Sequence, residues 1–258
     1  MVKSALNQDS LGLKLRSLAY NVMFYVNLVF FLFAGGWLIF FPRRMATIGL
    51  RAWARASLWW LKVICGLSME VRGREHMIKG ACLCAGKHQS AWETFALLPV
   101  LNDPSIVLKR ELAFIPIFGW FAIKFRMITL DRSAGPQALK GLISQAKKVA
   151  ADGMEVVIFP EGTRRPPGAE PDYKPGVAAL YLQLGLPCVP FALNSGHFWP
   201  RRSIIRRPGK VILEFLPQIP PGLARREFQA RLEREVEAAT ARLAAEAEAC
   251  LVGTKAEH

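Results

Sequence analysis

Residues 82–101 have the sequence CLCAGKHQSAWETFALLPVL, in which a polar turn separates two apolar segments. Residues 82–85 have the length and composition of a buried strand, and residues 91–101 those of a helix. His88 therefore lies between the end of a strand and the start of a helix. In α/β proteins, functional side chains are common at this position, because the carboxyl ends of the strands meet there.

The alternation of strand-like and helix-like runs continues on both sides of this stretch. The expected strands are residues 68–71, 106–108, 127–130, 155–159, 188–192 and 210–215. The expected helices are residues 137–151 and 177–184, followed by a charged C-terminal helix at residues 225–249. We therefore expect an α/β domain over residues 67–258, with a central mixed sheet flanked by helices.

Residues 1–66 are expected to form an N-terminal, membrane-anchoring helical region. Residues 20–41, YNVMFYVNLVFFLFAGGWLIFF, are apolar over a length that can cross a bilayer as a helix. Asn21, Asn27 and the Gly35-Gly36 pair also allow a hairpin that enters only one leaflet. Residues 53–67, WARASLWWLKVICGL, mix tryptophans with basic residues, as an interfacial helix does, although tryptophans also fill protein cores.

The composition supports contact with a membrane. Hydrophobic residues make up 52% of the chain, and the mean hydropathy is +0.21. More basic residues follow the apolar run than precede it: Arg43, Arg44, Arg51 and Arg55 against Lys3, Lys14 and Arg16. The positive-inside rule then places the C-terminal α/β domain on the cytoplasmic side of the inner (cytoplasmic) membrane.

The chain carries a formal charge of +14 and has a pI of about 10.0. Such a charge attracts an anionic membrane surface, small anionic substrates or nucleic acid. The aromatic residues gather in apolar runs and do not alternate with basic ones, which argues against nucleic acid. The five cysteines, four of them in apolar runs, indicate free thiols in a reducing compartment, and no metal site is expected.

His88 and Glu93 are the first candidate pair for catalysis. Five positions along a helix correspond to a rotation of about 140°, so the two side chains can meet only if His88 precedes the helix and the chain bends back. Ser90 and Glu93 also have the spacing of a capping box, so Glu93 has a purely structural alternative. His88 has one too, as a buried core histidine.

Three further segments have the composition of a lipid-binding site. Residues 159–165, FPEGTRR, end a strand with a glycine and two arginines, which suits a phosphate, although an ordinary turn has the same pattern. Residues 109–120 place Lys109 and Arg110 before a long apolar segment, which fits a phosphate head with an acyl tail or a core helix. Residues 189–196 are a strand that enters a turn.

In this order and spacing, the four segments resemble the glycerolipid acyltransferase family over residues 65–215. His88 and Glu93 are similar to its H-x4-D signature, Lys109–Gly119 with Leu130-Asp131-Arg132 to its second block, and residues 159–164 to its F-P-E-G-T-R block. Lys174-Pro175-Gly176 and Val189-Pro190 are similar to the segments that follow. The chain departs from the family pattern at Glu93 (usually Asp), Arg126 (often Gly) and Leu130 (usually Ile).

The resemblance implies a membrane-bound O-acyltransferase. It would move a fatty acyl group from acyl-CoA or acyl-carrier protein to the sn-2 hydroxyl of 1-acyl-glycerol 3-phosphate, giving phosphatidic acid. The acyl thioester is then a co-substrate, and no cofactor or metal is expected. The implied catalytic residues are His88 and Glu93. The implied substrate-binding residues are Lys109, Arg132, Glu161, Gly162, Thr163 and Arg164.

The implied partners are a lysophospholipid acceptor, an acyl thioester donor and an anionic membrane surface, without nucleic acid. Three other functions are consistent with the residues. One is an acyltransferase of the same superfamily that acts on a lyso-aminolipid such as lyso-ornithine lipid. The second is the initial acylation of glycerol 3-phosphate. The third is a basic protein that binds membranes without catalysis.

Overall fold

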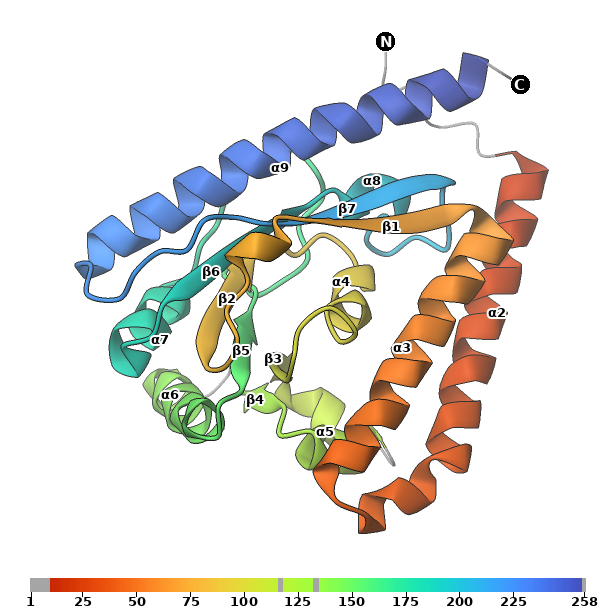
Figure 1. The fold of residues 1–258 in the computed structure, drawn as a ribbon. Helices are drawn as coiled ribbons and strands as arrows, with labels where there is room; N and C mark the ends of the chain where they lie inside the picture. The colour runs from red at the N-terminus through yellow and green to blue at the C-terminus, as the bar shows by residue number, and fades with distance from the viewer. Residues whose placement is uncertain (1–9, 116–117, 132–134, 257–258) are drawn as a thin grey trace.

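The computed structural model describes residues 10–115, 118–131 and 135–256. Within these ranges the strands form one seven-stranded sheet in the order β1-β7-β6-β2-β5-β3-β4 (Figure 1). The strands are β1 (Leu67–Arg72), β2 (Cys82–Gly86), β3 (Pro104–Lys109), β4 (Ile128–Leu130), β5 (Glu155–Ile158), β6 (Cys188–Leu193) and β7 (Gly209–Phe215). All neighbouring strands are parallel except β6 and β7, so the predicted mixed sheet is confirmed.

Helices cover both faces of this sheet. The longer ones in the α/β part are α6 (Pro136–Ala151), α7 (Gly176–Leu184) and α9 (Arg225–Ala256), and the short α4 (Trp92–Ala96) follows β2. Shorter helical segments are η2 (Arg74–His76), η3 (Arg110–Phe114), α5 (Phe118–Lys124) and α8 (Ser195–Phe198). The helix expected at residues 91–101 is wrong in length, because regular helix ends at Ala96 and turns follow. The C-terminal helix is longer than expected.

Alternate residues of the strands pack against different helices. On β2, Cys82 and Cys84 belong to a core with α3 (Arg43–Cys65) and α4, whereas Leu83 and Ala85 belong to a core with α6, α7 and α9. Successive side chains of a strand point to opposite faces, so an apolar strand in the middle of the sheet supplies both cores. The short apolar run before His88 is therefore buried on both sides.

The N-terminal region is a helical hairpin. Helix α2 (Leu11–Ala34) and the short η1 (Gly36–Phe40) lead into α3, and α2 packs beside α3 (Figure 1). Both helices begin earlier than the apolar runs at residues 20–41 and 53–67 suggest. The first ends at Gly35, whose N–H donates to the carbonyl of Phe31. The Gly35-Gly36 pair thus interrupts the apolar run, and the chain turns back.

Polar contacts attach α2 to the loop at residues 199–207. The Asn21 amide donates to the carbonyl of Ile204 (3.0 Å) and accepts from Arg206 Nη2 (2.9 Å). The Ser17 hydroxyl accepts the N–H of Arg206 (2.9 Å), and the rings of Tyr20 and Trp199 meet edge to face. The hairpin is therefore joined to the α/β part along its side, and a domain boundary at residue 66 stays a prediction.

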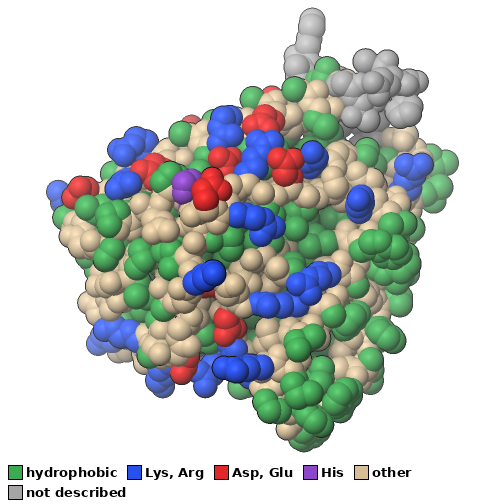
Figure 2. Space-filling model, in the orientation of Figure 1, with side chains coloured by type: hydrophobic (Ala, Val, Ile, Leu, Met, Phe, Trp, Pro, Cys, Tyr) green, Lys and Arg blue, Asp and Glu red, His purple; other side chains and the backbone are tan. Residues whose placement is uncertain are grey.

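The outer face of the hairpin exposes a broad apolar surface. Figure 2 shows hydrophobic side chains gathered over the part of the molecule formed by α2, η1 and α3, while lysines and arginines lie mainly elsewhere. Among the described helices, only α2 is long and apolar enough to cross a membrane. Most residues in its most apolar stretch are not buried. An exposed apolar surface of this extent is typical of a protein that associates with membranes.

Candidate active site

The carboxyl ends of β2, β3, β5 and β6 lie along one edge of the sheet, because these strands are parallel. β2 leads into His88, β5 into residues 159–165, β3 ends at Lys109, and β6 leads into Ser195. Segments that are more than a hundred residues apart in the chain thus meet at one edge. This is the position where open α/β sheets bind their ligands.

His88 and Glu93 form a hydrogen-bonded pair. His88 Nδ1 lies 2.9 Å from Oε1 of Glu93, and the same oxygen accepts the N–H groups of Gln89 (2.6 Å) and Ser90 (2.8 Å). A carboxylate in this setting can only accept, so Nδ1 carries the proton and donates it. The lone pair of the neutral imidazole is then on Nε2, for which no described residue supplies a hydrogen bond.

Glu93 is fully buried and receives donors on both oxygens. Oε2 accepts from the hydroxyls of Ser90 (3.0 Å) and Ser195 (2.8 Å). Burial alone raises the pKa of Glu93, but the hydrogen bond and charge of His88 and the N–H of Ser90 outweigh it, and the net pKa is lowered. Glu93 also accepts the Ser90 N–H, which is one half of the predicted capping box, but the Ser90 hydroxyl accepts the N–H of Trp92, and α4 begins after Ala91 without a side-chain cap.

The imidazole of His88 is held from a second side. It stacks on the ring of Phe159, with centroids 4.1 Å apart, and the His88 carbonyl accepts the N–H of Arg165 at 2.8 Å. The side chain retains 14% of its exposure. Phe159 and Arg165 belong to residues 159–165, which we call the arginine loop. This loop and residues 87–91, the histidine loop, therefore form one unit.

The arginine loop lies beside the histidine and contains a glycine and two arginines. Gly162 has a φ of 64°, a left-handed conformation that glycine adopts without the steric cost of a side chain. Thr163 is half-buried and Arg164 is exposed, and Arg164 makes no ion pair with any described residue. Arg165, in contrast, lies near Asp172 at 3.7 Å and donates to the carbonyl of Glu170. Arg164 is therefore the free cation of this loop within the described ranges.

Glu161 does not face the exposed side of the loop. Its carboxylate is buried and accepts from Lys87 Nζ at 2.9 Å, and Lys87 also contacts Glu237 of α9 at 2.6 Å. Burial raises the pKa of Glu161, although the Lys87 charge opposes this shift. The structure thus places Glu161 where it ties the arginine loop to the histidine loop. Lys87 was not predicted as a site residue, and its position next to His88 is the sequence signal that could have identified it.

The second block lies farther along the same edge. Lys109 Nζ contacts Glu111 at 2.7 Å, and Arg110 pairs with Asp131 at 2.6 Å, all on the surface. Arg132, the other predicted contact from this block, lies outside the described residues.

The departure at Arg126 has a structural explanation. Its φ is 55°, in the region that favours glycine, and its side chain pairs with Asp152. Its carbonyl accepts from Ser105 near the start of β3, at the edge of the sheet opposite His88. Arg126 therefore has no place in the site.

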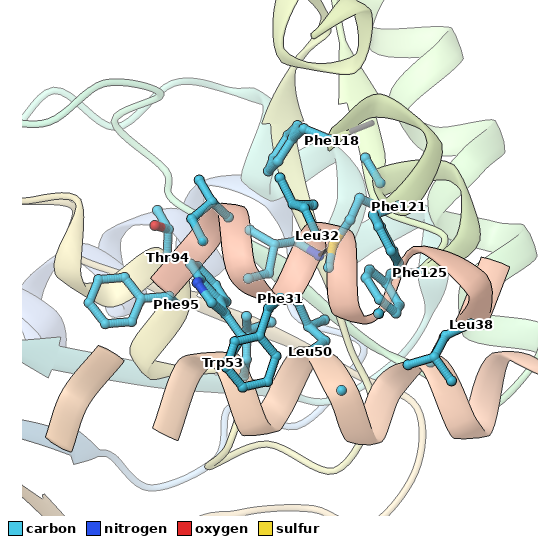
Figure 3. Close-up of a pocket in the computed structure, with 18 of the residues that line it drawn as sticks. Phe31, Leu32, Leu38, Leu50, Trp53, Thr94, Phe95, Phe118, Phe121 and Phe125 are labelled. Carbon is cyan, nitrogen blue, oxygen red and sulfur yellow. Dashed lines mark hydrogen bonds between the residues drawn. The ribbon is translucent and has the colours of Figure 1, made fainter. Parts of the chain in front are cut away.

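An apolar cavity of about 370 Å³ extends from α4 to the hairpin. Figure 3 shows Phe31, Leu38 and Leu50 on the hairpin side and Phe118, Phe121 and Phe125 opposite them. Thr94 and Phe95 of α4 also line it, and Thr94 directly follows Glu93. The cavity therefore begins beside the residue that orients His88. The sequence did not reveal it, because its walls come from five separate segments.

No described group of three histidine, cysteine, aspartate or glutamate side chains has an arrangement that holds a metal ion. Cys65, Cys82, Cys84 and Cys188 are buried free thiols, and burial raises the pKa of Cys65 to about 11. The side chains at the edge of the sheet instead suit general-base chemistry beside an anion.

Comparisons with known proteins identify the family. A family described as Acyltransferase matches residues 68–194. A 1-acyl-sn-glycerol-3-phosphate acyltransferase of Pseudomonas aeruginosa is 38% identical over 74% of this chain and 77% of its own. The 1-acyl-sn-glycerol-3-phosphate acyltransferase beta of Homo sapiens is 26% identical over 79% of this chain and 71% of its own. A crystal structure of the 1-acyl-sn-glycerophosphate (LPA) acyltransferase PlsC from Thermotoga maritima, 23% identical, shares the fold with a TM-score of 0.74, covering 89% of this chain and 97% of its own.

The fold and the histidine site define an acyl-transferring enzyme with a mixed α/β sheet. The chain belongs to the acyltransferase family. The family resemblance of the four sequence segments is thereby confirmed. Because the family consists of acyltransferases, the alternative of a membrane-binding protein without catalysis is excluded.

Proposed function

We propose that this enzyme transfers a fatty acyl group from an acyl thioester to the sn-2 hydroxyl of 1-acyl-glycerol 3-phosphate, giving phosphatidic acid. The observation that carries the proposal is the position of the His88–Glu93 pair. His88 contacts the arginine loop, and Thr94 and Phe95, which follow Glu93 on the same helix, line the apolar cavity. A phosphate, a hydroxyl and an acyl chain are the three chemical parts of this reaction, and each has a matching surface at one edge of the sheet.

His88 acts as the general base in this mechanism. Nε2 takes the proton from the acceptor hydroxyl as its oxygen attacks the thioester carbonyl carbon, and Glu93 stabilises the imidazolium that forms. The tetrahedral intermediate then expels the thiolate as the carbon–sulfur bond breaks, and the imidazolium returns the proton to sulfur. A thiolate is a good leaving group, so neither a covalent enzyme intermediate nor a cofactor is required.

The arginine loop binds the acceptor phosphate. Arg164 supplies a guanidinium with no competing carboxylate among the described residues, and the backbone at Gly162 and Thr163 is accessible for close approach. Lys109 contributes a second positive charge from the end of β3. Glu161 supports this site indirectly, because its ion pair with Lys87 holds the loop against the histidine segment.

The apolar cavity receives the fatty acyl chain, and the hairpin keeps its mouth at the membrane. α2 packs along the charged helix α3, and Ser17, Tyr20 and Asn27 face the protein. Only one side of α2 can therefore meet lipid, which favours insertion into a single leaflet over a full crossing. The enzyme would lie on the cytoplasmic face of the inner membrane, where the anionic lipids attract its positive charge.

An acyl-transfer assay with lysophosphatidic acid and both donors, acyl-CoA and acyl-carrier protein, tests the function. The wild type should release thiol and form phosphatidic acid, and His88→Ala should abolish both while leaving vesicle binding intact. Glu93→Gln should lower kcat by roughly 10²–10⁴, because an amide can still accept the Ser90 N–H but cannot stabilise an imidazolium. Full activity in His88→Ala would refute the mechanism.

A panel of acceptors then tests the substrate. Lysophosphatidic acid should be acylated faster than lyso-ornithine lipid and other lysolipids without a phosphomonoester. Faster acylation of lyso-ornithine lipid would replace the proposed acceptor by the aminolipid alternative and leave the histidine mechanism intact.

A further inference from the structure

Arg201 lies against the arginine loop, although it comes from a different part of the chain. Its Nη1 donates to the carbonyl oxygen of Arg164 at 2.7 Å. It belongs to the loop between α8 and β7 and follows the segment, residues 68–194, that the family pattern matches. No sequence block pointed to it.

The loop that carries Arg201 is firmly anchored. Arg206 is buried, and its Nη1 donates to the carbonyls of Ser203 (2.8 Å) and Ile205 (2.9 Å), closing the loop on itself. The Arg206 guanidinium also lies over the ring of Trp199, 3.8 Å from its centroid. With the bonds to Ser17 and Asn21 of α2, these contacts hold the loop between the hairpin and the arginine loop. Arg201 thus extends from a rigid support.

Arg164 and Arg201 are both available to bind an anion. Within the described ranges, neither pairs with a carboxylate, whereas Arg165 of the same loop lies near Asp172. The Arg201 guanidinium is bonded to the backbone carbonyl of Arg164, so it lies at the loop that carries this second cation. An anion bound at the loop is attracted by both positive charges.

We propose that Arg201 is a second phosphate ligand and sets the specificity of the acceptor site. The inference rests on the proposed function and deepens it. One N–H of the guanidinium is used on the Arg164 carbonyl, and the remaining donors are available to a phosphate oxygen. Two guanidiniums match the double charge of a phosphomonoester better than the single charge of a phosphodiester. The site should therefore select lysolipids that end in a free phosphate.

Arg201→Gln tests this inference, with Arg202→Gln as the matched control, because the neighbouring arginine has the same charge and is exposed. In mixed micelles, Arg201→Gln should raise the KM for lysophosphatidic acid by about 10-fold or more, as expected for a lost charge-assisted contact. The KM for the acyl donor, the kcat and the KM for uncharged monoacylglycerol should stay within about twofold. Arg202→Gln should match the wild type, and Arg201→Lys should restore part of the affinity.

Each other outcome has a defined meaning. An equal KM for lysophosphatidic acid in both glutamine variants would overturn the inference. A fall in kcat alone would overturn it too, since Arg201 would then only support the loop. A raised KM for the acyl donor would also overturn it, because Arg201 would then bind the thioester substrate. If the wild type itself acylates no phosphate-bearing acceptor, the proposed function fails, and the inference fails with it.

Discussion

The hydroxyl of Ser195 donates a 2.8 Å hydrogen bond to Oε2 of Glu93, and the two residues are 102 positions apart in the chain. Ser195 begins α8, directly after β6, and the neighbouring N–H of Gly196 donates to the Gln89 side chain at 2.9 Å. The histidine loop is therefore fixed by the strand next to its own. The orientation of His88 depends on this distant segment through Glu93.

Ser195→Ala should lower kcat by about 10-fold or more while leaving the KM of both substrates nearly unchanged. The variant removes one of two hydroxyls that bond Oε2, and a hydrogen bond to a charged group contributes about 1.5–3 kcal/mol. Steady-state kinetics with each substrate varied in turn is the measurement. Ser105→Ala is the control, because Ser105 is also buried but bonds the Arg126 carbonyl at the opposite edge. Equal kcat losses in both variants would contradict the positioning role.

The stability of the protein should depend on Glu93 in acid. The folded pKa of Glu93 is lowered, so between that value and the ordinary value of 4.5 the unfolded chain binds more protons. The stabilisation from Glu93 is therefore complete above pH 4.5 and is lost as the pH falls through the folded pKa. Denaturant unfolding in detergent should show the wild type more stable than Glu93→Gln at pH 7, with the gap closing in acid. A gap that does not change with pH would contradict this.

Gly49→Leu should shift the enzyme towards shorter acyl donors. Gly49 lines the apolar cavity from α3, where a Cβ would approach the end of the Leu38 side chain at 3.0 Å. Leucine is a better helix former than glycine, so the fold should tolerate the change while the cavity loses volume. Competition among donors of graded chain length measures the shift. Ile48→Phe, on the exposed side of the same helix, should leave the preference unchanged; a matching shift there would rule out the cavity as its cause.

Trp120→Ser should weaken binding to phospholipid vesicles by about 10-fold, the effect of losing one large apolar contact with lipid. Trp120 is 63% exposed on α5, which is joined to the hairpin turn because Lys124 Nζ donates to the Ile39 carbonyl at 2.9 Å. Vesicle flotation is the measurement. Leu182→Ser, which removes an exposed apolar side chain from α7, should bind as the wild type does. Unchanged flotation of the Trp120 variant would exclude α5 from the membrane surface.

Much of the secondary structure could be predicted, because its signals are local. The apolar runs before His88 and at residues 155–159 are strands, and the helix at residues 137–151 is present with nearly the expected ends. The hairpin helices were less predictable. α2 begins at Leu11 and α3 at Arg43, in stretches that mix basic and apolar residues, so the apolar runs mark only part of each helix.

The positions of some residues in the candidate site could be predicted from the sequence, and those of others could not. His88 and Glu93 are adjacent as proposed. Only half of the predicted capping box forms, because Glu93 accepts the Ser90 N–H but α4 begins after Ala91 without a side-chain cap. Glu161 belongs to the predicted loop but points inwards to Lys87, because a buried lysine requires a carboxylate partner. Lys109 lies on the expected edge with Glu111 as its neighbour. The catalytic and binding roles of these residues stay predictions.

By itself, the sequence determined the acyltransferase family, the strands and helices around His88, and the apolar character of the N-terminal region. These follow from residue types at short spacings, where period and composition act on the backbone directly. Only the tertiary structure decided that Ser195 supports Glu93, that Arg201 reaches Arg164, and that the hairpin and α5 enclose a cavity. Those contacts depend on the order of strands in the sheet and on which helices cover it, and residues far apart in the chain carry no local signal of either.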